Sequence, residues 1–188
     1  MNLYLIRHGR TDANAKHIYC GSTDLPLLEE GIAELRQKHY QVPENCHYIT
    51  SGMRRTEQTL YYLFGEVEHT QDLRFREMDF GIFEMHSYHE LKEREDYQKW
   101  ISGDNEANIT PGGESGNQMR ERVLEGLRHM QSSSKDIVLI THGGVIAAMM
   151  SFLFPEEDRS RFEWQPNPGE GYLVTAGTWE ALPKSTDR

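Results

Sequence analysis

Short aliphatic runs separated by helical patterns restrict this chain to a small set of folds. Residues 3–6 and 135–142 are β-branched and aliphatic, as in strands buried on both faces, and residues 47–52 form a third run of this kind. Between these runs, apolar residues recur every three or four positions, which predicts helices over residues 28–35, 60–64 and 119–130. This alternation predicts an α/β three-layer sandwich, with helices covering both faces of a mainly parallel sheet.

The remaining segments fit one predicted domain that spans residues 1–188. Residues 171–182 indicate a closing pair of strands, and we expect the polar end, residues 183–188, to fray. Residues 84–111 differ in character, because they are rich in charges with scattered aromatic side chains. We expect this segment to be a short helical insertion that forms a roof over a functional site.

Composition excludes several classes of partner. The formal net charge is −10, whereas nucleic acids and membrane surfaces attract basic patches, so neither is an expected partner. Cys20 and Cys46 show no pairing pattern, as expected for reduced thiols in a cytoplasmic protein. The N-terminal apolar run is too short for a signal peptide, and no later run approaches a membrane span. A homodimer remains open.

Functional residues follow the predicted strands. Arg7 and His8 end the first strand, residues 51–55 follow the second, residues 142–144 end the third, and Glu77 precedes the insertion. Because the carboxyl ends of parallel strands face one crevice, these groups are expected to converge. Helix N-termini after Gly52 and Gly144 are expected to point backbone N–H groups into the same pocket.

Phosphoryl transfer through histidine is the chemistry that fits this set. Arginines match the oxygens of a phosphate monoester, and an unprotonated imidazole is a competent nucleophile toward phosphorus. His8 is expected to attack, while a protonated His142 stabilises the transferring group. A neutral Glu77 would protonate the leaving alkoxide and then activate water. No metal or cofactor is required, because the arginines and histidines supply the positive charge.

The segment LIRHGRT, residues 5–11, resembles the L-x-R-H-G-x-T signature of the histidine phosphatase superfamily, also called the phosphoglycerate mutase-like family. The resemblance extends over nearly the whole chain, and it implies the fold of that family. Its further motifs are DLPLLEEGIAEL at residues 24–35, SGMRRTEQT at 51–59, the acid-bearing segment 73–81, PGGES at 111–115 and THGG at 141–144.

The resemblance also implies a role for each matching residue. It makes His8 the phosphorylated nucleophile, and it selects Arg55 over Arg54, a choice that spacing left open. The implied partners of His8 are Arg7 and Arg55 as phosphate ligands, His142 as the second histidine, Gly143 as a backbone donor beside it, Glu77 as the proton donor and Asn14 as a polar contact near the phosphate.

Departures from the family pattern bear on the substrate. Many relatives have an arginine where Ile18 stands, which disfavours a carboxylate-bearing substrate such as phosphoglycerate. The mutases also have a longer insertion than residues 84–111, and a short roof that admits water favours hydrolysis. The expected activity is therefore a metal-independent phosphomonoester hydrolase of a small phosphorylated metabolite. The alternatives are an α-ribazole-5'-phosphate phosphatase specifically, a phosphoglycerate mutase and a catalytically silent regulatory scaffold.

Several residues also have a plainer interpretation. A metal held by the two histidines and Glu77 is disfavoured, because the adjacent arginines would repel a cation. Residues 86–90, HSYHE, could chelate zinc, but a solvated face is the expected outcome. Glu77 could instead form a surface ion pair with Arg74 or Arg76. The aromatic residues of the insertion could contact the leaving group or attach the insertion to the body; they are Tyr88, Tyr97 and Trp100.

Overall fold

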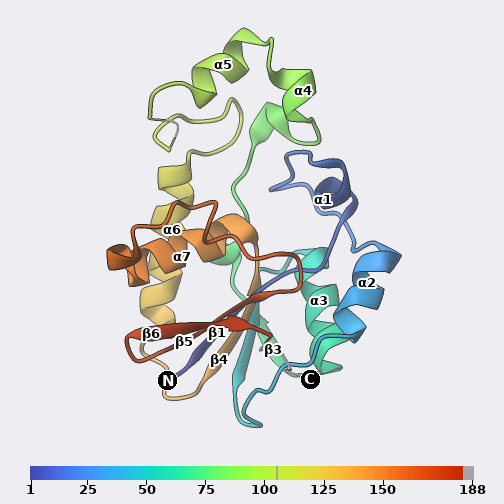
Figure 1. Ribbon diagram of the computed structural model, residues 1–188, viewed down its shortest axis with the longest axis vertical. Coiled ribbons are helices and arrows are strands. Elements are labelled where there is room, and N and C mark those ends of the chain that lie inside the picture. Colours follow the sequence, from blue (N-terminus) through green and yellow to red (C-terminus); the bar gives the residue numbers. More distant parts are fainter. Residues whose placement is uncertain (105, 184–188) are drawn as a thin grey trace.

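A six-stranded sheet with helices on both faces forms the body of the molecule (Figure 1). The computed structural model describes residues 1–104 and 106–183. The strand order is β3-β2-β4-β1-β5-β6. The first four are parallel, β5 is antiparallel to β1, and β6 is antiparallel to β5. The strands are β1 (Leu3–Arg7), β2 (His47–Thr50), β3 (His69–Gln71), β4 (Ile137–Thr141), β5 (Gly171–Thr175) and β6 (Thr178–Leu182).

The two central strands are buried on both faces, which explains their uninterrupted aliphatic sequence. In β1, Leu3 and Leu5 enter one core, while Tyr4 and Ile6 enter the core on the opposite face of the sheet. Strand β4 alternates in the same way between the two cores. Because successive side chains of a strand point to opposite faces, such a strand needs an apolar residue at every position. The predicted α/β sandwich is confirmed.

Helices α6 and α7 cover one face of the sheet, and α2 and α3 lie on the other (Figure 1). The predicted apolar spacing of residues 119–130 becomes the buried stripe of α6 against the sheet. Ser115 caps this helix by accepting from the amide of Gln118 at 3.1 Å. The helices of the body are α1 (Asp12–Lys16), α2 (Glu29–Arg36), α3 (Arg54–Phe64), α6 (Gly116–Met130) and α7 (Gly143–Leu153).

The predicted insertion is a small helical roof above the carboxyl ends of the parallel strands (Figure 1). It contains α4 (Tyr88–Leu91) and α5 (Glu95–Ile101). Tyr97 is buried, and its ring lies 5.4 Å from Phe83 and 5.6 Å from Trp100, so this tyrosine attaches the roof to the body. Tyr88 is exposed. Three single-turn 3₁₀ segments complete the described helices, at Leu73–Phe75, Gly81–Phe83 and Pro155–Glu157.

Some predicted boundaries shift by one or two residues. The strand expected over 47–52 ends at Thr50, because Gly52 adopts a φ of +74° and turns the chain toward α3. Helix α3 begins at Arg54 rather than directly after Gly52, and α7 begins at Gly143 rather than after Gly144. Residues 184–188 of the expected frayed end lie outside the described residues. No described helix is long and apolar enough to cross a membrane.

Candidate active site

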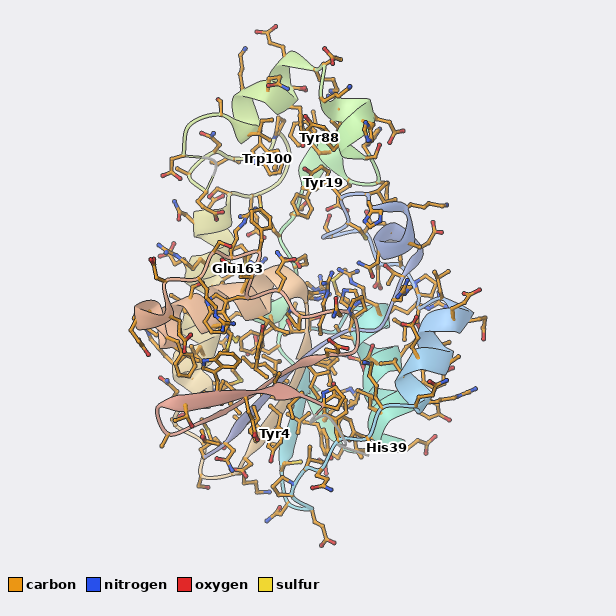
Figure 2. All side chains as sticks on the ribbon, viewed as in Figure 1. Tyr4, Tyr19, His39, Tyr88, Trp100 and Glu163 are labelled. Atoms are coloured by element: carbon orange, nitrogen blue, oxygen red, sulfur yellow. The ribbon has the colours of Figure 1, made fainter. Side chains whose placement is uncertain are left out.

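A cavity of about 630 Å³ lies at the carboxyl ends of β1, β2 and β4, beneath the roof. Figure 2 shows Tyr19 and Trp100 close together in the upper part of the molecule, where their rings are 5.7 Å apart, and both line this cavity. His142 is fully buried behind His8, with the two ring centroids 5.2 Å apart. The predicted site residues that line the cavity are Arg7, His8, Asn14, Arg55 and Glu77.

His8 directly follows β1 and is 5% exposed. Its Nδ1 lies 2.7 Å from the carbonyl oxygen of Gly9, and a carbonyl can only accept, so Nδ1 is the protonated nitrogen. Burial, followed by the positive charges of Arg55 and Arg7, lowers the pKa of His8 well below its ordinary value. The ring is therefore neutral at pH 7, with Nε2 as its basic nitrogen.

Arg7 and Arg55 flank this imidazole. Arg7 donates from Nη1 to the carbonyl of Pro166 at 2.8 Å, and its buried Nε has no partner among the described residues. Arg55 is 1% exposed and donates from its Nη atoms to the carbonyls of Gly21 and Thr23. Burial lowers the pKa of both guanidinium groups, which nevertheless remain charged. Each arginine keeps N–H groups available for an anion.

The carbonyls that hold Arg55 belong to a loop organised by Glu84. This carboxylate accepts hydrogen bonds from the amides of Gly21, Ser22 and Thr23 at 2.9–3.2 Å, and from the Thr23 hydroxyl at 2.7 Å. Gly21 has no room for a side chain, because a Cβ would lie 1.5 Å from the carbonyl oxygen of Met78. Glu84 therefore positions Arg55 through the loop backbone. Glu84 was not among the site residues predicted from the sequence.

A directional hydrogen-bond chain holds the ring of His142. The Thr56 hydroxyl donates to the carbonyl of Met53 at 2.7 Å, so its oxygen can accept from the Ser51 hydroxyl at 3.1 Å. The Ser51 oxygen is then left to accept from Nε2–H of His142 at 2.8 Å. At the opposite side of the ring, Arg55 donates from Nε to Nδ1 at 3.3 Å. The chain thus selects the neutral tautomer with its proton on Nε2.

The protonation state of His142 differs from the sequence expectation. Burial, then the charges of Arg55, His8, Arg7 and Arg122, lower the pKa of His142 well below its ordinary value. The cation at this position is Arg55, not the protonated imidazole that was expected. Nothing in the motif THGG indicated this, because the arginine and the serine that decide it come from a different strand end.

Glu77 lines the cavity next to the first turn of α7. Its Oε2 accepts from the amide of Gly144 and its Oε1 from the amide of Met78, both at 3.0 Å. Arg122, which sequence analysis missed, donates to the carbonyl of Glu77 and holds the segment from α6. The alternative ion pair with Arg74 or Arg76 does not form; Arg74 instead pairs with Asp72 and Glu125.

Asn14 and Gly143 both lie at the site, but the contacts that the structure gives them are a helix cap and a close packing contact. The Oδ1 of Asn14 accepts from the backbone amide of Thr11 at 3.0 Å, which caps α1, while the residue also lines the cavity. Gly143 is buried, and a Cβ there would lie 3.2 Å from Cζ of Arg7, so it permits that guanidinium to pack closely. The amide that meets the carboxylate is that of Gly144.

The possible zinc ligands of residues 86–90 do not form a metal site. Glu90 accepts from the amide and hydroxyl of Ser87 and caps α4, instead of joining His86 and His89. Within residues 1–104 and 106–183, three or more His, Cys, Asp or Glu residues do not gather as they would around a metal ion. Cys20 lines the cavity, and burial raises the pKa of its thiol.

The fold and this cavity define an α/β protein with two imidazoles and two arginines gathered at the carboxyl ends of its strands. Residues 3–175 match the sequence profile of the histidine phosphatase superfamily (branch 1), so the chain belongs to that family. A Salmonella typhi protein named "Probable phosphoglycerate mutase GpmB" is 30% identical over 164 residues, which are 80% of this chain and 74% of that protein.

Solved structures agree with the assignment. A phosphoglycerate mutase from Thermus thermophilus superimposes with a TM-score of 0.71 at 29% identity, covering 93% of this chain and 92% of that one. A candidate alpha-ribazole-5'-P phosphatase from Escherichia coli gives a TM-score of 0.81 at 23% identity, covering 96% and 94%. At that identity the second comparison shows the fold alone.

Proposed function

We propose that this protein hydrolyses phosphomonoesters of small metabolites through a phosphohistidine on His8. The observation that supports this most directly is the protonation of His8. Its Nδ1–H donates to the carbonyl of Gly9, which leaves the basic Nε2 for a substrate bound by Arg7 and Arg55, which line the same cavity. A neutral imidazole held in this way needs no deprotonation before it attacks.

The two chemical steps follow from the positions of the side chains. Arg7 and Arg55 bind the phosphate oxygens, and Nε2 of His8 attacks phosphorus as the bond to the alcohol oxygen breaks. Glu77 gives its proton to the departing alkoxide and becomes a carboxylate. In the second step this carboxylate takes a proton from water, the water oxygen attacks phosphorus, the P–N bond breaks, and inorganic phosphate leaves. Each step needs only the charges of the arginines, so the reaction is expected to proceed without metal.

Phosphoglycerate mutase activity is the second candidate, supported by the names of the relatives at about 30% identity. It would require the phosphoryl group to remain on His8 until a second acceptor alcohol replaces the first product. The short roof, with two helices of four and seven residues, disfavours such retention because water can enter. Conversion of 3-phosphoglycerate to 2-phosphoglycerate, primed by a bisphosphate, measures this activity directly.

The deciding experiment is release of inorganic phosphate with EDTA present. The panel contains an aryl phosphate, α-ribazole 5'-phosphate, 3-phosphoglycerate, sugar phosphates and nucleotides. We expect release by the native protein, and an acid-labile, base-stable phosphoryl group on His8 after rapid quenching. His8→Ala should abolish both signals, while His89→Ala, which removes an exposed roof histidine, should keep them. Substantial release by His8→Ala would exclude this residue as the nucleophile.

A further inference from the structure

The cavity is larger than a phosphate group requires. Its volume of about 630 Å³ lies within the range of roughly 300–1,000 Å³ for pockets that enclose drug-sized ligands. Beyond His8 and its arginines, the wall is largely apolar and comes from the loop after α1, the segment before the roof, the roof and helix α6. The apolar side chains of this part are Ile18, Tyr19, Phe80, Trp100, Ile101 and Met119.

Charged residues line the cavity in two groups. Arg7, Arg55 and Glu77 surround the phosphate position, whereas a second group comes from α6, the loop after α5 and the segment before β5. The second group is Arg120, Arg161 and Glu106. Each group contains two arginines and one glutamate, so each has an excess of one positive charge. This excess is unusual in a protein of net charge −10, and a cleft concentrates its field.

The two arginines of the second group differ in how they are held. Arg161 forms an ion pair with Glu106, and its Cζ lies 5.0 Å from the ring centroid of Phe162. These contacts limit its movement. Arg120 lies on the second turn of α6, is exposed, and has no partner among the described residues. The carbonyl of Glu106, the partner of Arg161, accepts from the amide of Asn117 at 2.9 Å on the first turn of α6, about one turn before Arg120, so the free and the fixed guanidinium groups line the same part of the cavity wall. Such a pair suits a planar carboxylate or a phosphate.

We propose that Arg120 and Arg161 form a second anion subsite, so that the preferred substrate is a phosphomonoester whose leaving group has an apolar middle and a distal anionic group. The apolar side chains of the same cavity then contact the middle of the substrate. Ile18 stands in the loop after α1 where many relatives have an arginine, so that position has no cation. Arg120 on α6 and Arg161 before β5 supply positive charge to the cavity instead. This inference rests on the proposed phosphatase function, because it assigns the scissile phosphate to the first group.

The test uses matched pairs of linear substrates. Phosphate esters of ω-hydroxy carboxylic acids with four, six and eight carbons are compared with the corresponding amides, which have the same length and a similar leaving alcohol. A third set with a terminal phosphonate distinguishes a carboxylate subsite from a phosphate subsite. At the best length, we expect kcat/KM for the acid to exceed that for the amide by about five- to tenfold, as for a charge-assisted hydrogen bond at a partly solvated site.

Variants assign this preference to the subsite. Arg120→Gln should bring the acid-to-amide ratio close to one, chiefly by lowering kcat/KM for the acid. Arg128→Gln removes the same charge from an exposed position near the end of the same helix, and should keep the preference. A ratio near one at every length in the native protein overturns the subsite. So does an Arg120→Gln variant that loses turnover of acid and amide equally.

Binding to an inactive protein separates this inference from the proposed function. His8→Ala is titrated calorimetrically with the same acid and amide pairs. If His8→Ala binds the acid more tightly than the amide, and the double variant with Arg120→Gln does not, the subsite is supported even if the native protein releases no phosphate. In that case the phosphatase proposal fails alone. Equal binding of acid and amide to His8→Ala overturns the subsite, even if phosphate release is fast.

Discussion

Replacing Ser51 by alanine tests the hydrogen-bond chain that sets the state of His142. Both residues are fully buried, and the Ser51 oxygen accepts the Nε2–H of His142 at 2.8 Å. Without that oxygen, Nε2–H has no acceptor, and the other tautomer would place a proton on Nδ1 opposite the Nε–H of Arg55. Leaving a buried donor unsatisfied costs about 1–3 kcal/mol.

This cost lowers either the free energy of unfolding or kcat. If the ring stays in place, the free energy of unfolding falls by about 1–3 kcal/mol. If the ring turns away, Arg55 loses a contact and kcat for an aryl phosphate falls by about five- to 150-fold, which is the same energy expressed as a rate. Urea unfolding and steady-state kinetics on one preparation distinguish the loss of stability from the loss of kcat.

Two further variants separate the hydroxyl group from the space it fills. Thr56→Val removes the acceptor of the Ser51 hydroxyl but leaves its oxygen next to His142, so its effect should be smaller than that of Ser51→Ala. Ser132→Ala, on the exposed end of the segment after α6, is the matched control and should change neither quantity. If Ser51→Ala alters stability by less than about 0.5 kcal/mol and kcat by less than about twofold, the chain does not hold His142.

Three other predictions concern protonation, the loop and the carboxylate. Burial lowers the pKa of His8 and His142, so below about pH 6.5 the unfolded chain binds more protons than the folded chain. The free energy of unfolding should therefore decrease as the pH is lowered below about 6.5, by up to about 1.4 kcal/mol per pH unit for each imidazole. His8→Asn should flatten this slope in urea titrations; equal slopes would contradict the assignment. Glu84→Gln weakens the loop that holds Arg55, so KM should rise more than kcat falls; an unchanged KM would place Arg55 outside phosphate binding. Gly144→Ala brings a Cβ within 2.5 Å of Oε1 of Glu77 and should lower kcat by about tenfold or more with little change in Tm, whereas native kcat would remove Glu77 from proton transfer.

Strands and helices with a strong periodic pattern were predictable from local sequence. The aliphatic runs of β1 and β4 and the apolar stripe of α6 each extend over several residues, so the burial that these elements require is visible in the sequence. Strand β3 was not predicted, because its three residues, His69–Gln71, lie at the sheet edge and contain no apolar alternation. The shifts at Gly52 and Gly144 reflect turn geometry that composition does not specify.

The sequence alone determined the chemistry available to this protein. Arg7, His8, Arg55, Glu77 and His142 were named from their positions after strands and from motif resemblance, and a parallel sheet brings such positions to one edge. Only the tertiary structure decided how these groups are tuned. The acceptor for His142, the loop under Arg55 and the free guanidinium of Arg120 come from segments distant in the chain. A hydrogen bond depends on distances of a few tenths of an ångström and on proton direction, and these are settled only when the separate elements pack together.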